Sequence, residues 1–244
     1  MAMITDTATA TDTDTSTHRI DAPAMAALDL YKDIHKAIRA DLFAVTGRAG
    51  EVDPLDRRGR ADLADRVRFS VDLLVSHADH EDTVIQPVLE TERPDLAEII
   101  ATDHHRLEPR MDDLVVLAGA VEEAVDADAR RWTHQLYLEL ADFTGTYLAH
   151  QHTEERVVMP ALEAAIGVDA VLGLHEAIIT SIPPDEMAAS LAIMIPAMNL
   201  DDRAELLGGM RQAAPAEVFA GVWALVGTVL DPADVACLAQ RLGL

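Results

Sequence analysis

Histidine and glutamate recur in this chain at a spacing that lets them act together. His77 is followed four residues later by Glu81, and His150 is followed four residues later by Glu154. Residues four apart in an α-helix lie about 40° apart around its axis, so each pair can point an imidazole and a carboxylate at one place. This residue pair at this spacing is typical of metal ligands on a helix.

The two pairs belong to an internal repeat. The phrase SHADHEDTVIQPVLE at residues 76–90 returns as AHQHTEERVVMPALE at residues 149–163, with His, Glu, Val, Pro, Leu and Glu in the same register. A further histidine stands upstream of each copy, His35 in DIHKAIRADL and His104 in TDHHRLEPRMDDL. The repeating unit is therefore one His, a long gap and then His-x-x-x-Glu, written twice.

Apolar residues at steps of three and four predict the helices that carry these side chains. We expect helices over about 23–45, from between 54 and 61 to about 89, from 94 to about 118, and from just after 126–129 to about 161. Gly47 and Gly50 should end the first helix, Pro87 should kink or end the second, and Pro109 should distort the third. Four amphipathic helices with short polar links predict an all-α protein built as an antiparallel four-helix bundle.

The bundle is expected to occupy residues 23–167, with different sequence on either side. Residues 1–22 are rich in Thr and Asp with almost no large apolar residue, which predicts a disordered tail. Residues 168–244 predict a C-terminal extension of short helices, with openings at Pro184, after Asn199, at Pro215 and at Pro232. The extension holds one histidine and no ligand-spaced pair, which favours packing or a protein partner surface over a second metal site.

Composition excludes several classes of partner. The formal net charge is −24 and Lys32 and Lys36 are the only lysines, which argues against binding to nucleic acid or an anionic membrane. A single cysteine, Cys237, fits a reducing compartment. We find no export signal, and the longest apolar run, residues 187–198, is too short to span a bilayer, so we expect a cytoplasmic protein.

The predicted stripes place four histidines and two glutamates inside the bundle. Buried ionisable groups are costly unless they are paired or coordinate a metal. A set of hydrogen-bonded core histidines is the alternative, but the repeated pattern favours a metal site. Imidazole and carboxylate together suit iron, although the spacing also admits zinc or manganese.

These residues resemble the hemerythrin-like, or HHE cation-binding, domain over about residues 24–166. The resemblance implies a four-helix bundle around a non-haem centre of two iron ions joined by an oxo or hydroxo bridge. It further implies that Glu81 and Glu154 bridge the irons, that His35 and His77 bind one iron, and that His104 and His150 bind the other.

The chain departs from the oxygen-carrying hemerythrins at two positions. Those proteins have a fifth metal-binding His four residues after the third-helix His, where this chain has Glu108. Their fourth-helix carboxylate is an Asp five residues after its His, where Glu155 follows the better-matched Glu154. Glu108 is therefore a candidate ligand, or its coordination position is open to water, peroxide or nitric oxide, and reversible dioxygen carriage is not favoured.

Two functions follow from the resemblance. The first is a protein that binds or senses iron, dioxygen or nitric oxide, and the second is a catalase-like di-iron enzyme that consumes peroxide or another small oxidant. Near the site, His80 and His105 are expected at helix seams or as hydrogen-bond donors to ligands. Tyr31 and Tyr147 are expected to pack in the core, with a hydrogen bond to a bound oxygen species as the alternative.

Overall fold

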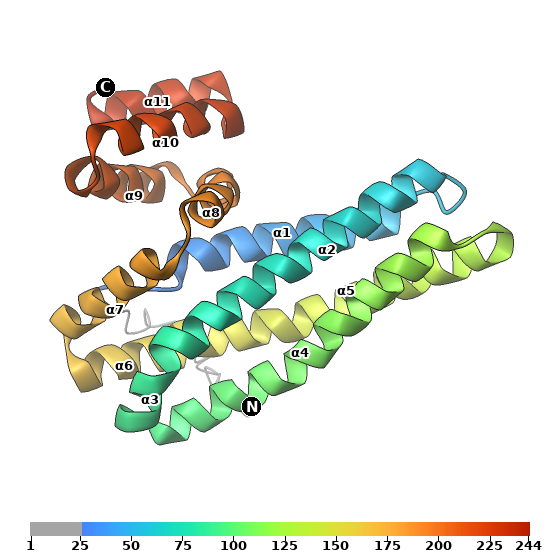
Figure 1. Ribbon diagram of the computed structural model, residues 1–244, viewed down its shortest axis with the longest axis horizontal. Coiled ribbons are helices and arrows are strands. Elements are labelled where there is room, and N and C mark those ends of the chain that lie inside the picture. The colour runs from blue at the N-terminus through green and yellow to red at the C-terminus, as the bar shows by residue number, and fades with distance from the viewer. Residues whose placement is uncertain (1–25) are drawn as a thin grey trace, which may run out of the picture.

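The computed structural model describes residues 26–244, so the predicted tail over residues 1–22 lies outside the described residues. The described part is built of helices and contains no strand, which confirms the all-α prediction. The helices are α1 (Lys32–Glu51), α2 (Arg57–His80), α3 (Gln86–Glu92), α4 (Pro94–Glu123), α5 (Asp126–Thr153), α6 (Met159–Ile166), α7 (Val168–Ser181), α8 (Pro184–Ala197), α9 (Leu200–Ala213), α10 (Ala216–Val229) and α11 (Pro232–Leu242), with π-helical turns η1 (Glu81–Ile85) and η2 (Glu154–Val158) (Figure 1).

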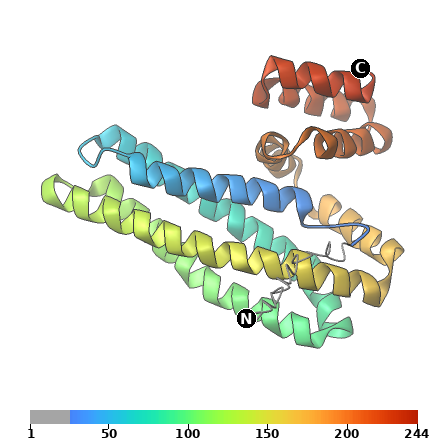
Figure 2. The ribbon, with the colours of Figure 1, turned by 180° about the vertical axis from the view of Figure 1, so that it is seen from behind.

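Four long helical segments lie side by side and carry the repeated residues. Helix α1 packs against α2 and α5, and α4 packs against the same two helices. Consecutive segments run in opposite directions, with the α1–α2 and α4–α5 links at one end (Figures 1 and 2). The second segment continues from α2 through η1 and α3, and the fourth continues from α5 through η2 and α6.

The two copies of the repeat contain the same helix irregularity. The backbone N–H of Gln86 donates to the carbonyl of Glu81 in η1, and the N–H of Met159 donates to the carbonyl of Glu154 in η2. The residue after each donor is the proline of the repeat, which cannot donate and would clash with a carbonyl four residues earlier. The wider π-turn accommodates the proline, so the helix continues past Pro87 instead of ending there.

The first helix begins later and ends later than the sequence predicts. Residues 26–31 precede the helix, and the Asp29 carboxylate accepts hydrogen bonds from the N–H groups of Tyr31 (3.0 Å) and Lys32 (3.2 Å), which delays its start. The helix also passes Gly50, where an added Cβ would lie 3.2 Å from the Tyr137 ring. That glycine therefore permits close packing of α1 on α5 and does not end the helix.

Pro109 lies inside α4, and the helix continues through it. Pro109 and His105, whose carbonyl loses its helical hydrogen bond, are both exposed. Water can satisfy such a carbonyl, so the helix tolerates the proline there.

Two apolar clusters fill the bundle, and the candidate ligands separate them. Tyr31, which directly precedes α1, belongs to the cluster beside α3, α6 and α7, whereas Ile38 of α1 belongs to the cluster toward the α1–α2 link. His35 stands between them, and the candidate ligands of the other three helices are placed in the same way. The fold therefore holds these polar side chains at one level of an otherwise apolar core.

The C-terminal helices have a core of their own. A third apolar cluster contains Leu191, Ile195, Met198, Leu207, Val226 and Leu238. Helix α7 does not share it, because Val171 packs in the bundle cluster instead. Helix α8 packs against α1, which places the C-terminal helices beside the bundle (Figure 1).

No single helix in residues 26–244 has the length and apolar character needed to cross a membrane. The segment Asp126–Ile166 and helix α7 meet that test only as a pair, bent by 116°.

Candidate metal centre

Six side chains from the four long helices meet at the level between the two apolar clusters. They form two overlapping groups, and within each group one ligand atom per residue lies within 4.8 Å of the others. The first group is His35, His77, Glu81 and Glu154, and the second is Glu81, His104, His150 and Glu154. Because both groups contain the same two carboxylates, the arrangement offers two adjacent cation positions with Glu81 and Glu154 between them.

Distances within the groups suit coordination of a common ion. The Nε2 atoms of His35 and His77 are 3.1 Å apart, and His77 Nε2 is 3.1 Å from Glu81 Oε1. The other oxygen of Glu81 lies 3.4 Å from His104 Nε2, so this carboxylate faces a histidine of each group. Ligand atoms bound at about 2.1 Å to one metal are themselves roughly 3.0–3.4 Å apart.

Glu154 makes the equivalent contacts from η2. Its Oε1 lies 3.1 Å from His150 Nε2, and its Oε2 lies 3.4 Å from His35 Nε2. The two glutamates thus hold equivalent places, as their positions in the sequence repeat predict.

The metal-binding atoms lack other partners. All four carboxylate oxygens of Glu81 and Glu154 are buried and accept no hydrogen bond of normal geometry, despite the short distances to histidine nitrogens. The Nε2 atom of His104 is likewise buried without a hydrogen-bond partner. Unpartnered carboxylates in a core are costly, and a pair of divalent cations would satisfy them. The residues therefore fit a two-metal centre.

Carboxylates outside the two groups contact the far side of the histidine rings. His35 Nδ1 lies 3.0 Å from Glu155 Oε1, and Arg39 donates to both oxygens of Glu155 at 2.6 and 2.9 Å. His104 Nδ1 lies 2.9 Å from Asp82 Oδ1. Such contacts fix the ring orientation and tautomer of a metal ligand.

The sequence alone identifies Glu155 only as a departure from the oxygen carriers, and it does not identify Asp82 as a site residue. One signal could have found both residues. Each directly follows the glutamate of its repeat copy, so the motif is His-x-x-x-Glu followed by a second acid.

These contacts divide the histidines electrostatically. Burial lowers the pKa of His35 to about 4 and keeps its ring neutral. Burial acts in the same direction on His104, but Asp82 and Glu81 outweigh it and raise its pKa to about 10. For Glu155, burial is outweighed by His35 and Arg39, which lower its pKa to about 2.

The shared glutamates cannot both carry a free charge easily in the metal-free core. Burial and the charge of Glu81 raise the pKa of Glu154 well above its usual range. Burial also opposes ionisation of Glu81, but His77 and His104 hold its pKa well below the usual range. Without a metal, burial beside Glu81 therefore favours the protonated form of Glu154, whereas His77 and His104 favour the ionised form of Glu81.

The remaining predicted site residues lie outside the two groups. Glu108 is exposed on α4, and His105 is exposed beside the ligand His104. His80 is half-buried, with its Nδ1 atom 2.6 Å from the Ser76 carbonyl. The structure thus separates these three side chains from the buried cluster.

Tyr31 and Tyr147 do border the cluster. The Tyr31 ring stacks on His35 at 5.0 Å, and the Tyr147 ring meets His150 edge-on at 5.6 Å. Burial, together with the charges of Glu81 and Glu154, raises the pKa of both phenols well above 10, so they stay protonated.

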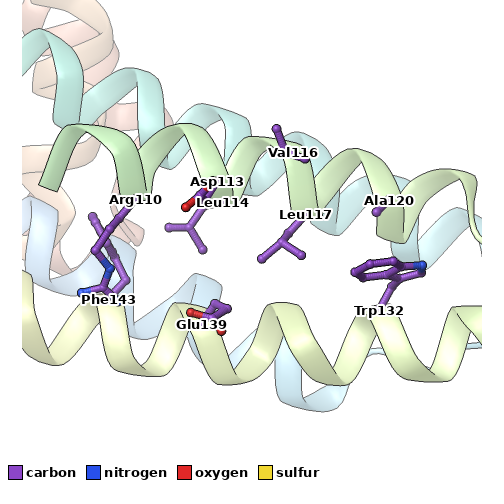
Figure 3. A pocket seen from close by; sticks show the side chains of 9 residues that line it. All are labelled: Arg110, Asp113, Leu114, Val116, Leu117, Ala120, Trp132, Glu139 and Phe143. Atoms are coloured by element: carbon purple, nitrogen blue, oxygen red, sulfur yellow. The ribbon is translucent and has the colours of Figure 1, made fainter.

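A groove of about 380 Å³ lies elsewhere, between α4 and α5 toward their connecting link (Figure 3). Arg110 and Phe143 stand at one end of it and Trp132 at the other (Figure 3). None of the six clustered ligands lines this groove.

The helical architecture and the buried histidine and glutamate cluster define a class, an all-α protein with a cation-binding core. Residues 26–162 match the family model described as Hemerythrin HHE cation binding domain. The chain belongs to this family, and the resemblance inferred from its repeated motif is confirmed. Neither the curated proteins nor the solved structures include a significant match to the chain.

Proposed function

We propose that the chain is a non-haem di-iron protein of hemerythrin type that binds or senses dioxygen, nitric oxide or iron itself. The observation that carries the proposal is the sharing of Glu81 and Glu154 by two four-residue groups. Imidazole and carboxylate ligands together suit iron. In this proposal the histidines of each group bind one ion and the two glutamates contact both.

The protein's own residues prepare this site in three ways. Glu155 and Asp82 orient His35 and His104 through their Nδ1 atoms. The apolar clusters on either side exclude bulk water, which strengthens electrostatic attraction at the site. Four protein ligands at each position leave room for an exogenous ligand, since octahedral ions take six. Two iron ions would supply exchangeable coordination positions and one-electron redox chemistry.

Metal analysis and optical spectroscopy test the proposal. Protein produced with sufficient iron should hold close to two irons per chain and show a near-ultraviolet oxo-to-iron band. Nitric oxide added to the reduced protein should change that spectrum. Stoichiometric zinc with no iron under the same conditions would defeat the di-iron assignment.

A peroxide-consuming enzyme is the second candidate. The exposure of Glu108 favours it, because a side chain directed to solvent does not replace the fifth imidazole of the oxygen carriers. The position is then open to peroxide, and open positions are what a reactive centre needs. Oxygen release from peroxide by the iron-loaded protein, absent from the metal-free protein, would favour the enzyme over the sensor.

We further propose that the chain divides into a tail at 1–22, the bundle at 23–167 and an extension at 168–244 that carries the state of the centre to a protein partner. The separate apolar core of α8 to α11 supports a distinct unit, with α7 as its link to the bundle. Lys32 and Lys36, which flank His35, pair with Asp202 of α9. A shift of His35 on ligand binding therefore has a direct route to the extension.

A further inference from the structure

The two halves of the bundle place equivalent residues around the two cation positions. His35 and His104 head the two halves of the repeat, and Glu155 and Asp82 occupy equivalent places one residue after the shared glutamates. Glu155 contacts His35 Nδ1 at 3.0 Å, and Asp82 contacts His104 Nδ1 at 2.9 Å. Each position therefore has one outer carboxylate behind a histidine ligand.

The halves differ at the residue four after the first histidine. In the first half this residue is Arg39, and its guanidinium donates to both oxygens of Glu155 at 2.6 and 2.9 Å. In the second half the equivalent residue is Glu108. Within residues 26–244 no lysine or arginine pairs with Asp82, whose ion-pair partner is His104. Arg39 thus neutralises the outer carboxylate of Glu155 in the first half, whereas the residue equivalent to Arg39 in the second half is the acid Glu108.

A second difference adds to the first. The residue before the first histidine is the apolar Ile34 in one half and Asp103 in the other. Asp103 Oδ2 lies 3.7 Å from His150 Nδ1. Its arginine contact is Arg106, at 4.0 Å, and that side chain is 74% exposed, so solvent weakens the compensation.

We infer that the two metal positions are unequal, and that the His104–His150 position binds a divalent cation first and more tightly than the His35–His77 position. This inference rests on the proposed two-metal function. Glu155 and Arg39 together contribute no net charge beside the His35–His77 position. Asp82 and Asp103 contribute two negative charges beside the other position, and Glu108, four residues after His104 on α4, contributes a third from an exposed position. Uncompensated carboxylates attract a cation, and Asp82 and Asp103 act at short range, 2.9 and 3.7 Å from the histidine rings, where salt screens least.

Cobalt(II) titration of the metal-free full-length protein tests the order of filling. Calorimetry should show two binding steps, with the second at least tenfold weaker. The first ion repels the second at whichever position it binds, so a weaker second step alone does not identify the preferred position. The location of the first ion identifies it. Crystals grown with one equivalent of cobalt should show the anomalous signal at the His104–His150 position. A first ion at His35–His77, or equal occupancy of both positions, would overturn the inference.

Charge variants separate this effect from ordinary repulsion. Glu108→Arg installs in the second half the cation that Arg39 supplies in the first, and it should weaken the first binding step about three- to tenfold. Arg39→Gln should strengthen the weaker position by a similar factor, whereas Arg39→Lys, which keeps the charge, should behave as wild type. Arg131→Gln, an exposed change near the start of α5, is the matched control and should alter neither step.

The outcomes distinguish failure of this inference from failure of the proposed two-metal function. If the folded Glu108→Arg and Arg39→Gln variants bind cobalt with the wild-type affinities in both steps, the inference is wrong. Two bound cobalt ions per chain in that case still support the two-metal function. Failure of the wild-type protein to bind cobalt or iron would remove the proposed function itself. Thermal unfolding of each metal-free variant shows whether it is folded before titration.

Discussion

The ligand cluster of the bundle and the C-terminal helices differ in how their buried charges are satisfied. In the C-terminal helices, Arg203 is 8% exposed and donates to the Ile195 carbonyl (2.8 Å), the Pro196 carbonyl (3.2 Å) and Asp234 (2.8 Å). In the bundle, the carboxylates of Glu81 and Glu154 are buried and accept no hydrogen bond. The extension satisfies this buried charge internally, whereas the two shared carboxylates of the bundle are left for ions supplied from outside.

Removal of a shared carboxylate should have the largest effect on metal binding by the bundle. Glu81 belongs to both ligand groups, so Glu81→Ala should abolish most iron binding. It should also remove the metal-linked stability of the protein, about 2.7 kcal/mol when free metal is 100 times its dissociation constant. Iron content and the metal-dependent shift in Tm measure the two effects.

The same repeat copy offers a matched control. Glu90 is exposed and lies outside both groups, so Glu90→Ala should retain two irons. A Glu81→Ala protein that still holds two irons would remove Glu81 from the centre.

Metal binding should release protons from the buried ligands of the bundle. The pKa of His104 is raised to about 10, so at pH 7 a metal must displace its proton, whereas His35, with a pKa of about 4, is already neutral. Metal affinity should therefore rise with pH, by up to tenfold per unit for one proton, until about pH 10. Calorimetry in buffers of different ionisation enthalpy counts the released protons, and Asp82→Asn should reduce the count.

The same shift predicts the stability of the metal-free protein. Because the folded-state pKa of His104 is raised, its contribution is fully present below about pH 6.5 and is lost as pH rises through about 10. A metal-free protein whose stability rises over this range would contradict the assignment of charge to His104.

Loss of Arg203 should destabilise the extension alone. Arg203→Ala leaves the buried Ile195 carbonyl and the partly buried Pro196 carbonyl without this donor, at a cost of about 1–3 kcal/mol. Hydrogen exchange within α8 to α11 should increase while iron content stays at two. Arg211→Ala is the control, because that exposed side chain donates only to the Leu242 carbonyl. Iron loss in Arg203→Ala would show that the two regions are not independent.

The lysine contacts between the regions should contribute less. Lys36 contacts Asp202 across the α1–α9 boundary, and both side chains are partly exposed. A double-mutant cycle with Lys36→Ala and Asp202→Ala should give a coupling energy of about 0–1 kcal/mol that falls with salt. A coupling above that range would indicate a more rigid junction than the contact geometry supports.

Glu108→Ala should have the smallest effect on iron content and thermal stability, because water already solvates the Glu108 carboxylate. Glu108→Ala should keep two irons and a Tm within about 1 °C of wild type, given that surface changes usually stay within ±0.5 kcal/mol. A loss of one iron would mean that Glu108 is a ligand after all.

Several features were predictable because local rules decide them. The four long helices follow from apolar periodicity, and the helix starts at Pro94, Pro184 and Pro232 follow from the preference of proline for a first helical turn. The same rules failed at Gly50, since its role depends on the Tyr137 ring from α5. At Pro109 the helix continues, because a proline on the solvent side of a helix leaves the freed carbonyl to water.

The sequence by itself determined which six side chains face the core, because helical periodicity and the repeat assign each to an apolar stripe. It also carried the family, since the match rests on the same motif. Only the tertiary structure decided that Glu108 faces solvent, that Asp82 and Glu155 stand behind the histidines, and that Arg39 neutralises one of them. These contacts join residues up to 120 positions apart, and no periodicity within one helix reports which side chains another helix brings beside it.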